Sequence, residues 1–99
     1  MNTEDYLDRR LTQDPSFVTR RIAGELILVP IQQQAGSVAS IYPLNELARF
    51  IWELVDGEKR VRDIRDAIVD EFEVEPEEAE TDLVEFLQRL EYVGALRAI

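Results

Sequence analysis

Carboxylates are the only reactive side chains that this chain of 99 residues holds in quantity, with 21 Asp and Glu in all. Their densest run, EVEPEEAETD at 73–82, raises the question of a cation site. Calcium needs about six oxygen ligands in a shaped loop, and the D-x-D-x-D-G spacing of an EF-hand is absent. Nothing marks a carboxylate pair whose pKa values a pocket would separate, as acid–base catalysis requires. The run is typical of the acidic, solvated start of a helix, and the sequence predicts no metal site.

Nucleophilic and redox chemistry are disfavoured by what the chain lacks. It contains no cysteine and no histidine, so thiolates, disulfides and imidazole bases are excluded. Ser16, Ser37 and Ser40 therefore have no histidine to activate them. Neither the GxxxxGK nor the GxGxxG pattern of a phosphate-binding loop occurs. We expect no enzyme and no cofactor, which leaves binding as the class of function to explain.

Charge and hydropathy narrow the choice of partner. The formal net charge of −10 opposes binding to nucleic acid and to anionic membranes. No apolar run approaches the roughly 20 residues that span a bilayer. The N-terminal MNTEDYLDRR mixes acids with bases and lacks the apolar segment of a signal peptide. We therefore expect a cytoplasmic protein that binds neither nucleic acid nor membrane.

The first structural half of the chain is predicted to be a sheet. Strand-forming residues fill 17–31, and Ala23-Gly24 is a turn signal in their middle, which indicates a β-hairpin. The second arm is apolar on both faces, as in a central strand or one covered by helices, and ends at Pro30. After a polar loop, residues 38–42 form a third strand that ends before Pro43. Short connections favour an antiparallel three-stranded meander with two edges.

The second half is predicted to be three helices, which makes the fold class α+β. The first spans about 45–56, with Asn45 as its N-cap and Asp56-Gly57 as its end. Its aromatic residues Phe50 and Trp52 are interpreted as core packing. The second helix spans about 62–72. The third opens at Pro76, a favoured first residue, and ends at Val93-Gly94.

The division into domains follows from these elements. A domain is predicted over 15–99, preceded by a polar tail over 1–14. The favoured interpretation of the tail is a frayed, flexible terminus. The alternative is a short helical turn that docks through Leu7 and Leu11, which lie four residues apart.

The third strand carries no lysine and no other charge over 38–42. An edge strand exposes a row of unpaired N–H and C=O groups, and charged side chains commonly protect such an edge. One interpretation is that an extended peptide adds itself there as a further strand. The other is that the third helix or a second protomer covers the edge. Residue chemistry alone leaves these two interpretations balanced.

A set of motifs extends over about 17–96. Leu44-Asn45-Glu46 follows the third strand and leads into the aromatic-bearing helix ARFIWELVDG at 48–57. Val61 and Ile64 give a V-x-x-I pattern, and the last helix ends in FLQRLEYVGAL at 86–96. In their combination and spacing these motifs resemble the PqqD family, the peptide chaperones of pyrroloquinoline quinone biosynthesis, and the wider class of RiPP recognition elements. Pro43 in front of the Leu-Asn pair departs from the family pattern, and 1–14 matches nothing in it.

The resemblance implies a winged-helix-like unit of three strands and then three helices. It also implies a non-catalytic module that binds the leader segment of a ribosomally made precursor peptide. Such modules present the leader to a modifying enzyme, often a radical SAM enzyme or, in lasso-peptide systems, a leader peptidase. The leader lies as an added strand on the third strand, against the third helix. Carried onto this chain, the peptide-binding residues are Val38, Ala39, Ser40, Ile41, Tyr42, Asp82, Glu85, Phe86 and Arg89.

We assign roles to these residues as expectations. The backbone of 38–42 supplies hydrogen bonds, while Ile41, Tyr42 and Phe86 form apolar pockets. Arg89 pairs with an acid of the leader. The carboxylates, Asp82 and Glu85, pair with its bases.

Two rival functions remain from the sequence. A winged-helix transcription regulator has an overlapping topology but needs a basic recognition helix, whereas the second and third helices carry more acids than bases. A homodimerising scaffold domain would use the same strand edge to pair with a second copy of itself.

Overall fold

The computed structural model describes residues 3–31 and 42–99, and the fold is described for these residues. Their strands form two three-stranded sheets, in the orders β2-β3-β4 and β5-β1-β6, which we call the hairpin sheet and the terminal sheet. The elements in chain order are α1 (Thr3–Leu7), β1 (Arg10–Gln13), β2 (Phe17–Ile22), β3 (Glu25–Pro30), β4 (Tyr42–Leu44), α2 (Glu46–Leu54), β5 (Asp56–Arg60), α3 (Val61–Phe72), α4 (Pro76–Tyr92) and β6 (Leu96–Ala98).

The hairpin sheet confirms the predicted antiparallel meander. Ala23 and Gly24 connect β2 to β3 with φ values of 52° and 84°, as a tight hairpin turn of the I′ type requires. The register runs from Phe17 opposite Pro30 at one end to Ile22 opposite Glu25 at the turn. Strand β3 is central, because β4 pairs with its other side. None of the residues from Leu26 to Pro30 is exposed, so apolar side chains on both faces of β3 are at least partly buried.

The third strand differs from its prediction at the end that can be compared. Residues 38–41 of the predicted strand lie outside the described residues. Strand β4 begins at Tyr42 and continues through Pro43 to Leu44, so the expected end before Pro43 is wrong. Pro43 lies opposite Ile27 of β3. An edge strand tolerates proline because its missing N–H can face away from the neighbouring strand.

The three predicted helices are present with small changes at their ends. Asn45 caps α2, and its side-chain oxygen accepts a hydrogen bond of 2.8 Å from the backbone N–H of Ala48. Helix α2 ends at Leu54, two residues before the predicted end, because Asp56 already begins β5. Helix α4 starts at Pro76 as expected, and its last residue, Tyr92, directly precedes the predicted Val93-Gly94 stop.

The terminal sheet is absent from the sequence prediction. Its central strand is β1, which pairs antiparallel with both β5 and β6. Residues 3–13 were favoured as part of a frayed tail but instead form α1 and β1, with Tyr6, Leu7 and Leu11 each 2% exposed. Leu7 and Leu11 do pack into the core, as the alternative required. They do so from a helix and a strand, however, and not from one helical turn.

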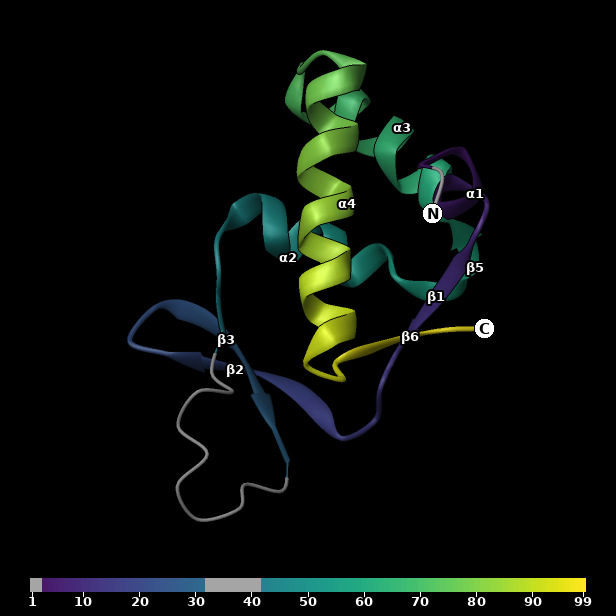
Figure 1. Ribbon diagram of the computed structural model, residues 1–99. Coiled ribbons are helices and arrows are strands. Elements are labelled where there is room, and N and C mark those ends of the chain that lie inside the picture. Colours follow the sequence, from purple (N-terminus) through teal and green to yellow (C-terminus); the bar gives the residue numbers. More distant parts are fainter. Residues whose placement is uncertain (1–2, 32–41) are drawn as a thin grey trace.

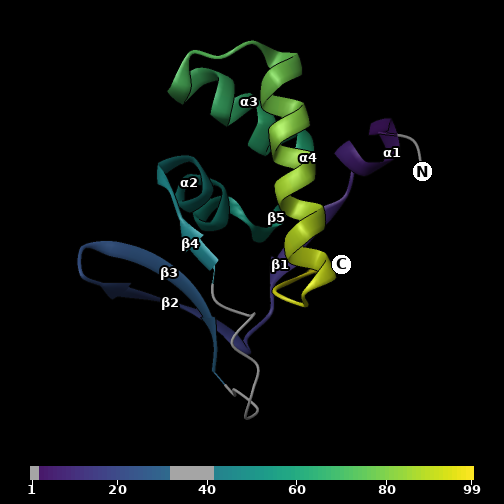
Figure 2. The same cartoon turned by 60° about the vertical axis from the view of Figure 1, so that its left-hand side comes forward.

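Helix α4 lies between the two sheets (Figure 1). The hairpin sheet is on one side of it, and α1 with the terminal sheet is on the other. In the turned view the β2–β3 hairpin projects away from the helices (Figure 2). The core joins one face of α4 to buried residues of the other helices; these residues include Ile51, Trp52, Ile64, Ile68, Leu83, Leu87 and Leu90. No helix in the described part of the chain is long and apolar enough to cross a bilayer.

Candidate functional site

A pocket of about 640 Å³ opens where the tip of the β2–β3 hairpin, the β4–α2 junction and α4 come together. Segments far apart in the sequence therefore contribute to it, from Arg21 in β2 to Arg89 in α4. Its lining residues are Arg21, Gly24, Glu25, Leu26, Pro43, Leu44, Asn45, Glu46, Ala48, Arg49, Phe86 and Arg89.

Local sequence signals fix the three walls of this pocket. The tight turn at Gly24 places the hairpin tip, because only residues that accept positive φ allow the chain to reverse there. The cap at Asn45 starts α2 directly after β4 and so sets Ala48 above the strand end. On α4, Phe86 and Arg89 are three residues apart and thus share a face of the helix.

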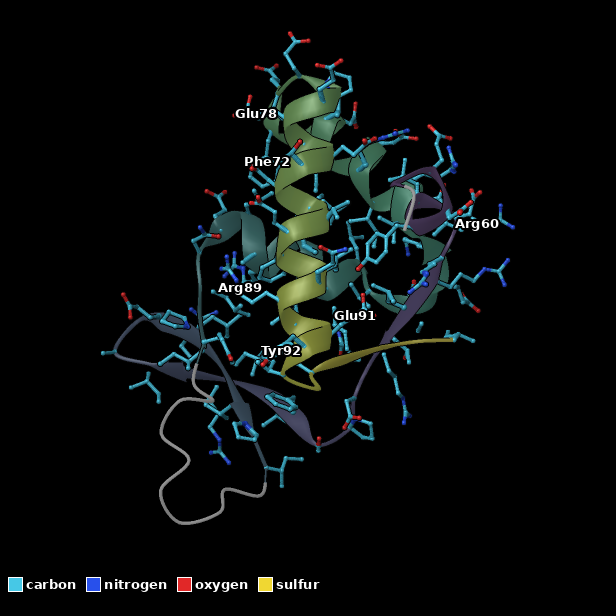
Figure 3. The ribbon with its side chains drawn as sticks, in the orientation of Figure 1. Arg60, Phe72, Glu78, Arg89, Glu91 and Tyr92 are labelled. Atoms are coloured by element: carbon cyan, nitrogen blue, oxygen red, sulfur yellow. The ribbon has the colours of Figure 1, made fainter. Side chains whose placement is uncertain are left out.

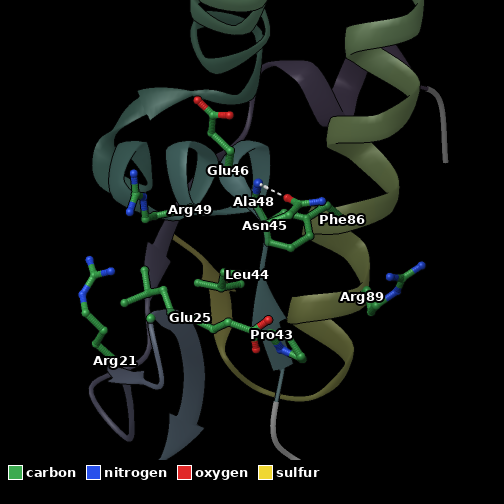
Figure 4. Close-up of a pocket in the computed structure, with 12 residues that line it drawn as sticks. Arg21, Glu25, Pro43, Leu44, Asn45, Glu46, Ala48, Arg49, Phe86 and Arg89 are labelled. Atoms are coloured by element: carbon green, nitrogen blue, oxygen red, sulfur yellow. Dashed lines mark hydrogen bonds between the residues drawn. The ribbon is translucent and has the colours of Figure 1, made fainter.

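The pocket has an apolar floor and a charged rim. Leu44 and Ala48 are buried, and Phe86 is half-buried between them and solvent. In Figure 4, Arg21 and Arg49 lie on one side of Phe86 and Leu44, and Arg89 lies on the other. All three arginines are exposed. Such a surface can hold an apolar group by burial and an anionic group by charge.

The structure brings together only some of the residues expected from the sequence. Phe86 and Arg89 line the pocket. Tyr42 is half-buried in β4 and packs against the core, outside the lining. Asp82 and Glu85 are exposed on α4 and also lie outside the lining. Val38, Ala39, Ser40 and Ile41 fall outside the described residues.

Two rim residues, Arg21 and Arg49, were not found by sequence reasoning. Arg21 comes two residues before the predicted turn, so its place at the hairpin tip followed from the hairpin itself. Arg49 lies one residue after the buried Ala48 on α2, in the first turn of a helix whose start was predicted. The missing step was the packing of the hairpin beside α2, which no local pattern encodes.

The opposite side of α4 is occupied by the N-terminal segment. The buried Tyr6 hydroxyl of α1 donates a hydrogen bond of 2.5 Å to Oε1 of Glu91. Burial and this contact with Glu91 raise the pKa of Tyr6 well above its ordinary value of 10.0. The guanidinium of Arg9 lies 5.6 Å from the centre of the Tyr6 ring. Figure 3 shows Glu91 and Arg89 on opposite sides of the helix, so α4 uses one side for packing and leaves the other to the pocket.

The acidic side chains do not form a metal-binding group in the part of the chain that the structure describes. Within residues 3–31 and 42–99, no group of three or more Asp and Glu side chains is placed to hold a metal ion. The acidic run at 73–82 instead begins at the C-cap of α3, Glu73, and continues through the short link into the first turns of α4, with Glu77 and Glu78 in the first turn of α4. This agrees with its interpretation as a helix start.

Comparison with known proteins places this geometry in a family. The model of the family described as coenzyme PQQ synthesis protein D (PqqD) matches residues 25–96, well over half of the chain. A solved structure, TbiB1 in complex with the TbiA(beta) leader peptide, superposes with a TM-score of 0.69 at 28% identity. The match covers 87% of this chain and 94% of TbiB1. No curated protein matches the chain. The resemblance noted in the sequence is thereby confirmed, and neither match is to the DNA-binding regulator considered as a rival: the chain belongs to the PqqD family.

Proposed function

We propose that this chain is a non-catalytic module that captures the leader segment of a ribosomally made precursor peptide and presents it to a maturation enzyme. The observation that carries the proposal is the shared fold with TbiB1, whose solved structure includes a leader peptide. The pocket between the hairpin, β4 and α4 gives this chain a matching place for an extended ligand. Binding is also the class of function that the residue inventory favours, since histidine and cysteine are absent.

The leader is proposed to bind as an added strand along the free side of β4. Strand β4 pairs with β3 on one side, and no strand among the described residues pairs with its other side. A peptide in this position gains main-chain hydrogen bonds from the edge and specificity from the side chains around it. The backbone of 38–42 is proposed to supply most of these hydrogen bonds.

Side chains on both walls are proposed to read the leader. Phe86 and Tyr42, together with Ile41, would contact its apolar residues, because Phe86 and Tyr42 are large and half-buried. Arg89, at the pocket rim, would pair with an acid of the leader. Asp82 and Glu85 are exposed one turn closer to the start of α4 and would pair with bases that lie beyond the pocket.

The partner enzyme is proposed to be a radical SAM enzyme or a leader peptidase, acting in the cytoplasm. In this arrangement the chain contributes affinity for the leader and the enzyme contributes the chemistry. A homodimer that pairs through the β4 edge would compete with the leader for the same hydrogen-bonding groups. Sedimentation with and without peptide separates these two uses of the edge. A self-pairing scaffold predicts a tight dimer that added peptide leaves unchanged, whereas a leader-binding edge predicts that peptide binds and that any dimer formed through this edge dissociates.

Titration followed by amide-shift mapping tests the proposed site. The probes are the TbiA(beta) leader peptide and the leader segment of any short precursor encoded beside this chain's gene. We expect shifts concentrated in β4 and in the part of α4 around Phe86 and Arg89. Shifts that avoid both elements while binding occurs elsewhere would show that strand addition at β4 is wrong.

A pair of alanine variants on α4 provides the matched control. Phe86→Ala removes a lining side chain and should weaken leader binding by at least about ten-fold, the usual effect of truncating an aromatic anchor. Val84→Ala removes a half-buried side chain of the same helix that does not line the pocket. It should change the stability of the fold without a comparable loss of affinity. Equal affinity losses in both variants would contradict a role for Phe86 in contacting the peptide.

A further inference from the structure

Three arginines from three separate elements line the pocket, two on one side of its floor and one on the other. Arg21 comes from β2, Arg49 from α2 and Arg89 from α4. Within residues 3–31 and 42–99 the salt bridges involve only Lys59, Arg62 and Arg65 among the cations. The pocket arginines therefore stand exposed around an apolar floor without an ion-pair partner in the described structure.

The charge of the pocket lining has the opposite sign to the net charge of the whole chain. The chain has a formal net charge of −10, yet three arginines face the pocket against two glutamates, Glu25 and Glu46. Neither glutamate forms an ion pair with the arginines beside it. Solitary surface arginines are common and need no explanation, but three from distant segments that line one hollow give it a local excess of positive charge. That excess favours an anionic group in the pocket, while the remaining surface repels one.

The spacing of the floor and the rim suits an extended peptide. Phe86 and Arg89 are three positions apart on α4, a rise of about 4.5 Å along the helix axis. Residues on one face of an extended strand recur every second position, about 6.6 Å apart. Arginine side chains are long enough to make up the difference. One side chain of a bound strand can thus rest on Phe86 while the next on the same face reaches the guanidinium groups.

We propose that the pocket selects leader segments in which an Asp or Glu lies two residues from a large apolar residue. The apolar side chain packs on Phe86 and Leu44, and the carboxylate lies at the rim, beside Arg21 and Arg49 on one side of that floor or beside Arg89 on the other. Guanidinium groups bind carboxylates through paired N–H donors, which gives both charge and direction to the contact. The inference rests on the proposed leader-binding function and specifies which leaders the site accepts.

Selection from a random library of displayed 12-residue peptides tests this inference without knowledge of the natural leader. Peptides enriched by the wild-type chain should carry Asp or Glu two positions from an apolar residue. Replacing that acid by its amide in a selected peptide should weaken binding to the wild type by about ten-fold. The affinity should also fall as salt is raised, because the contact is ionic and exposed. The amide replacement needs no protein variant, so it reads the contact even where a variant fails to fold.

Variants of the chain identify the residues responsible. In the triple variant Arg21→Gln, Arg49→Gln, Arg89→Gln, the acidic peptide and its amide form should bind equally. The control is Arg20→Gln, which removes an exposed arginine of the same strand as Arg21 that does not line the pocket. The control should retain the ten-fold preference for the acid.

The possible failures are distinguishable. Selected peptides that shift the amides of β4 and α4 but show no acidic preference would overturn the acid-selective rim and leave the leader-binding function intact. A preference for the acid that persists in the triple variant would overturn the assignment to these arginines. A selection that yields peptides bound away from both β4 and α4 would overturn the proposed function together with the inference.

Discussion

The hairpin sheet and the terminal sheet have the same number of strands and the same antiparallel pairing, but they are built from different kinds of segment. The hairpin sheet joins strands that follow one another in the chain, and four of the six residues of β2 are exposed. The terminal sheet joins β1, β5 and β6, which lie near the beginning, middle and end of the chain. The first leaves one side of β4 without a neighbouring strand among the described residues, whereas the second ties distant segments together.

Helix α4 lies between the two sheets and presents a different face to each side. Glu91 faces α1 and accepts the hydrogen bond of Tyr6, while Arg89, two residues earlier, faces the pocket (Figure 3). Residues two apart on a helix point to different sides. The contact with α1 and the lining of the pocket therefore lie on different faces of one helix. Variants on the two sides should separate a loss of stability from a loss of peptide binding.

The largest effect is expected from the core of the terminal sheet. Leu11→Ala in β1 should lower the free energy of unfolding by about 2–5 kcal/mol, because the side chain is 2% exposed and leaves a cavity. Ile22→Ala, on β2 of the hairpin sheet, removes an aliphatic side chain that is 53% exposed and should change it by less than about 0.5 kcal/mol. Urea unfolding measures both. Similar losses in the two variants would break the comparison between the sheets.

The next largest loss of stability is expected from the hydrogen bond between α1 and α4. Tyr6→Phe should lower the free energy of unfolding by about 1–2 kcal/mol, because Glu91 loses its hydrogen-bond donor. The folded-state pKa of Tyr6 is raised above 10.0, so its stabilising contribution is complete below pH 10 and is lost as the pH rises further. The variant should therefore show a weaker loss of stability above pH 10 than the wild type in urea unfolding.

Tyr92→Phe is the control for this measurement, since Tyr92 is 92% exposed at the end of α4, the helix that carries Glu91. It should leave stability unchanged at every pH. Peptide affinity should also stay unchanged in Tyr6→Phe, because the contact lies on the side of α4 away from the pocket. An affinity loss in this variant would show that the two faces of α4 are coupled.

A pair of glycines allows the same substitution in each sheet. Gly24 and Gly57 both have φ of 84°, so alanine should cost about 1–2 kcal/mol at either position. A Cβ at Gly24 meets nothing within 4 Å, whereas at Gly57 it lies 3.3 Å from Cδ1 of Ile99. Urea unfolding should show the larger loss for Gly57→Ala. A larger loss for Gly24→Ala would mean that the hairpin turn, and not the terminal sheet, is the more constrained.

The smallest effect is expected at low pH. Asp56, the first residue of β5, accepts hydrogen bonds from the backbone N–H groups of Glu58 and Lys59 and from the Lys59 side chain. These bonds hold its pKa well below the usual 3.8, so its contribution is present above about pH 4 and is lost as the pH falls. Asp56→Asn should flatten the pH dependence of unfolding between pH 4 and pH 2. An unchanged slope would show that these bonds add nothing to the terminal sheet.

The hairpin sheet and the helices could be predicted because their signals are local. Ala23-Gly24 marked the turn, Asn45 marked the cap and Pro76 marked the start of α4, and each is where the sequence placed it. The apolar period of each helix then identified the face that packs. The family motifs added the expected binding strand, most of which lies outside the described residues.

The terminal sheet could not be predicted because its strands carry no local signal. β5 reads DGEKR, with a charge at four of its five positions, and β6 has three residues. Their pairing with β1 depends on contacts between distant parts of the chain, which periodicity does not record. For the same reason the pocket rim could not be predicted, since Arg21 and Arg49 line one pocket only because the hairpin packs beside α2.

Pro43 sets a limit on what the open edge of β4 can support. Fibrils grow when identical strands stack without interruption, each offering N–H and C=O groups to the next. Proline has no N–H, so a continuous ladder cannot run through β4 at this position. A short peptide can bind beside the interruption, but an unlimited stack of copies cannot form across it. The residue that departs from the family pattern thus lets the chain keep an edge available without becoming a seed for aggregation.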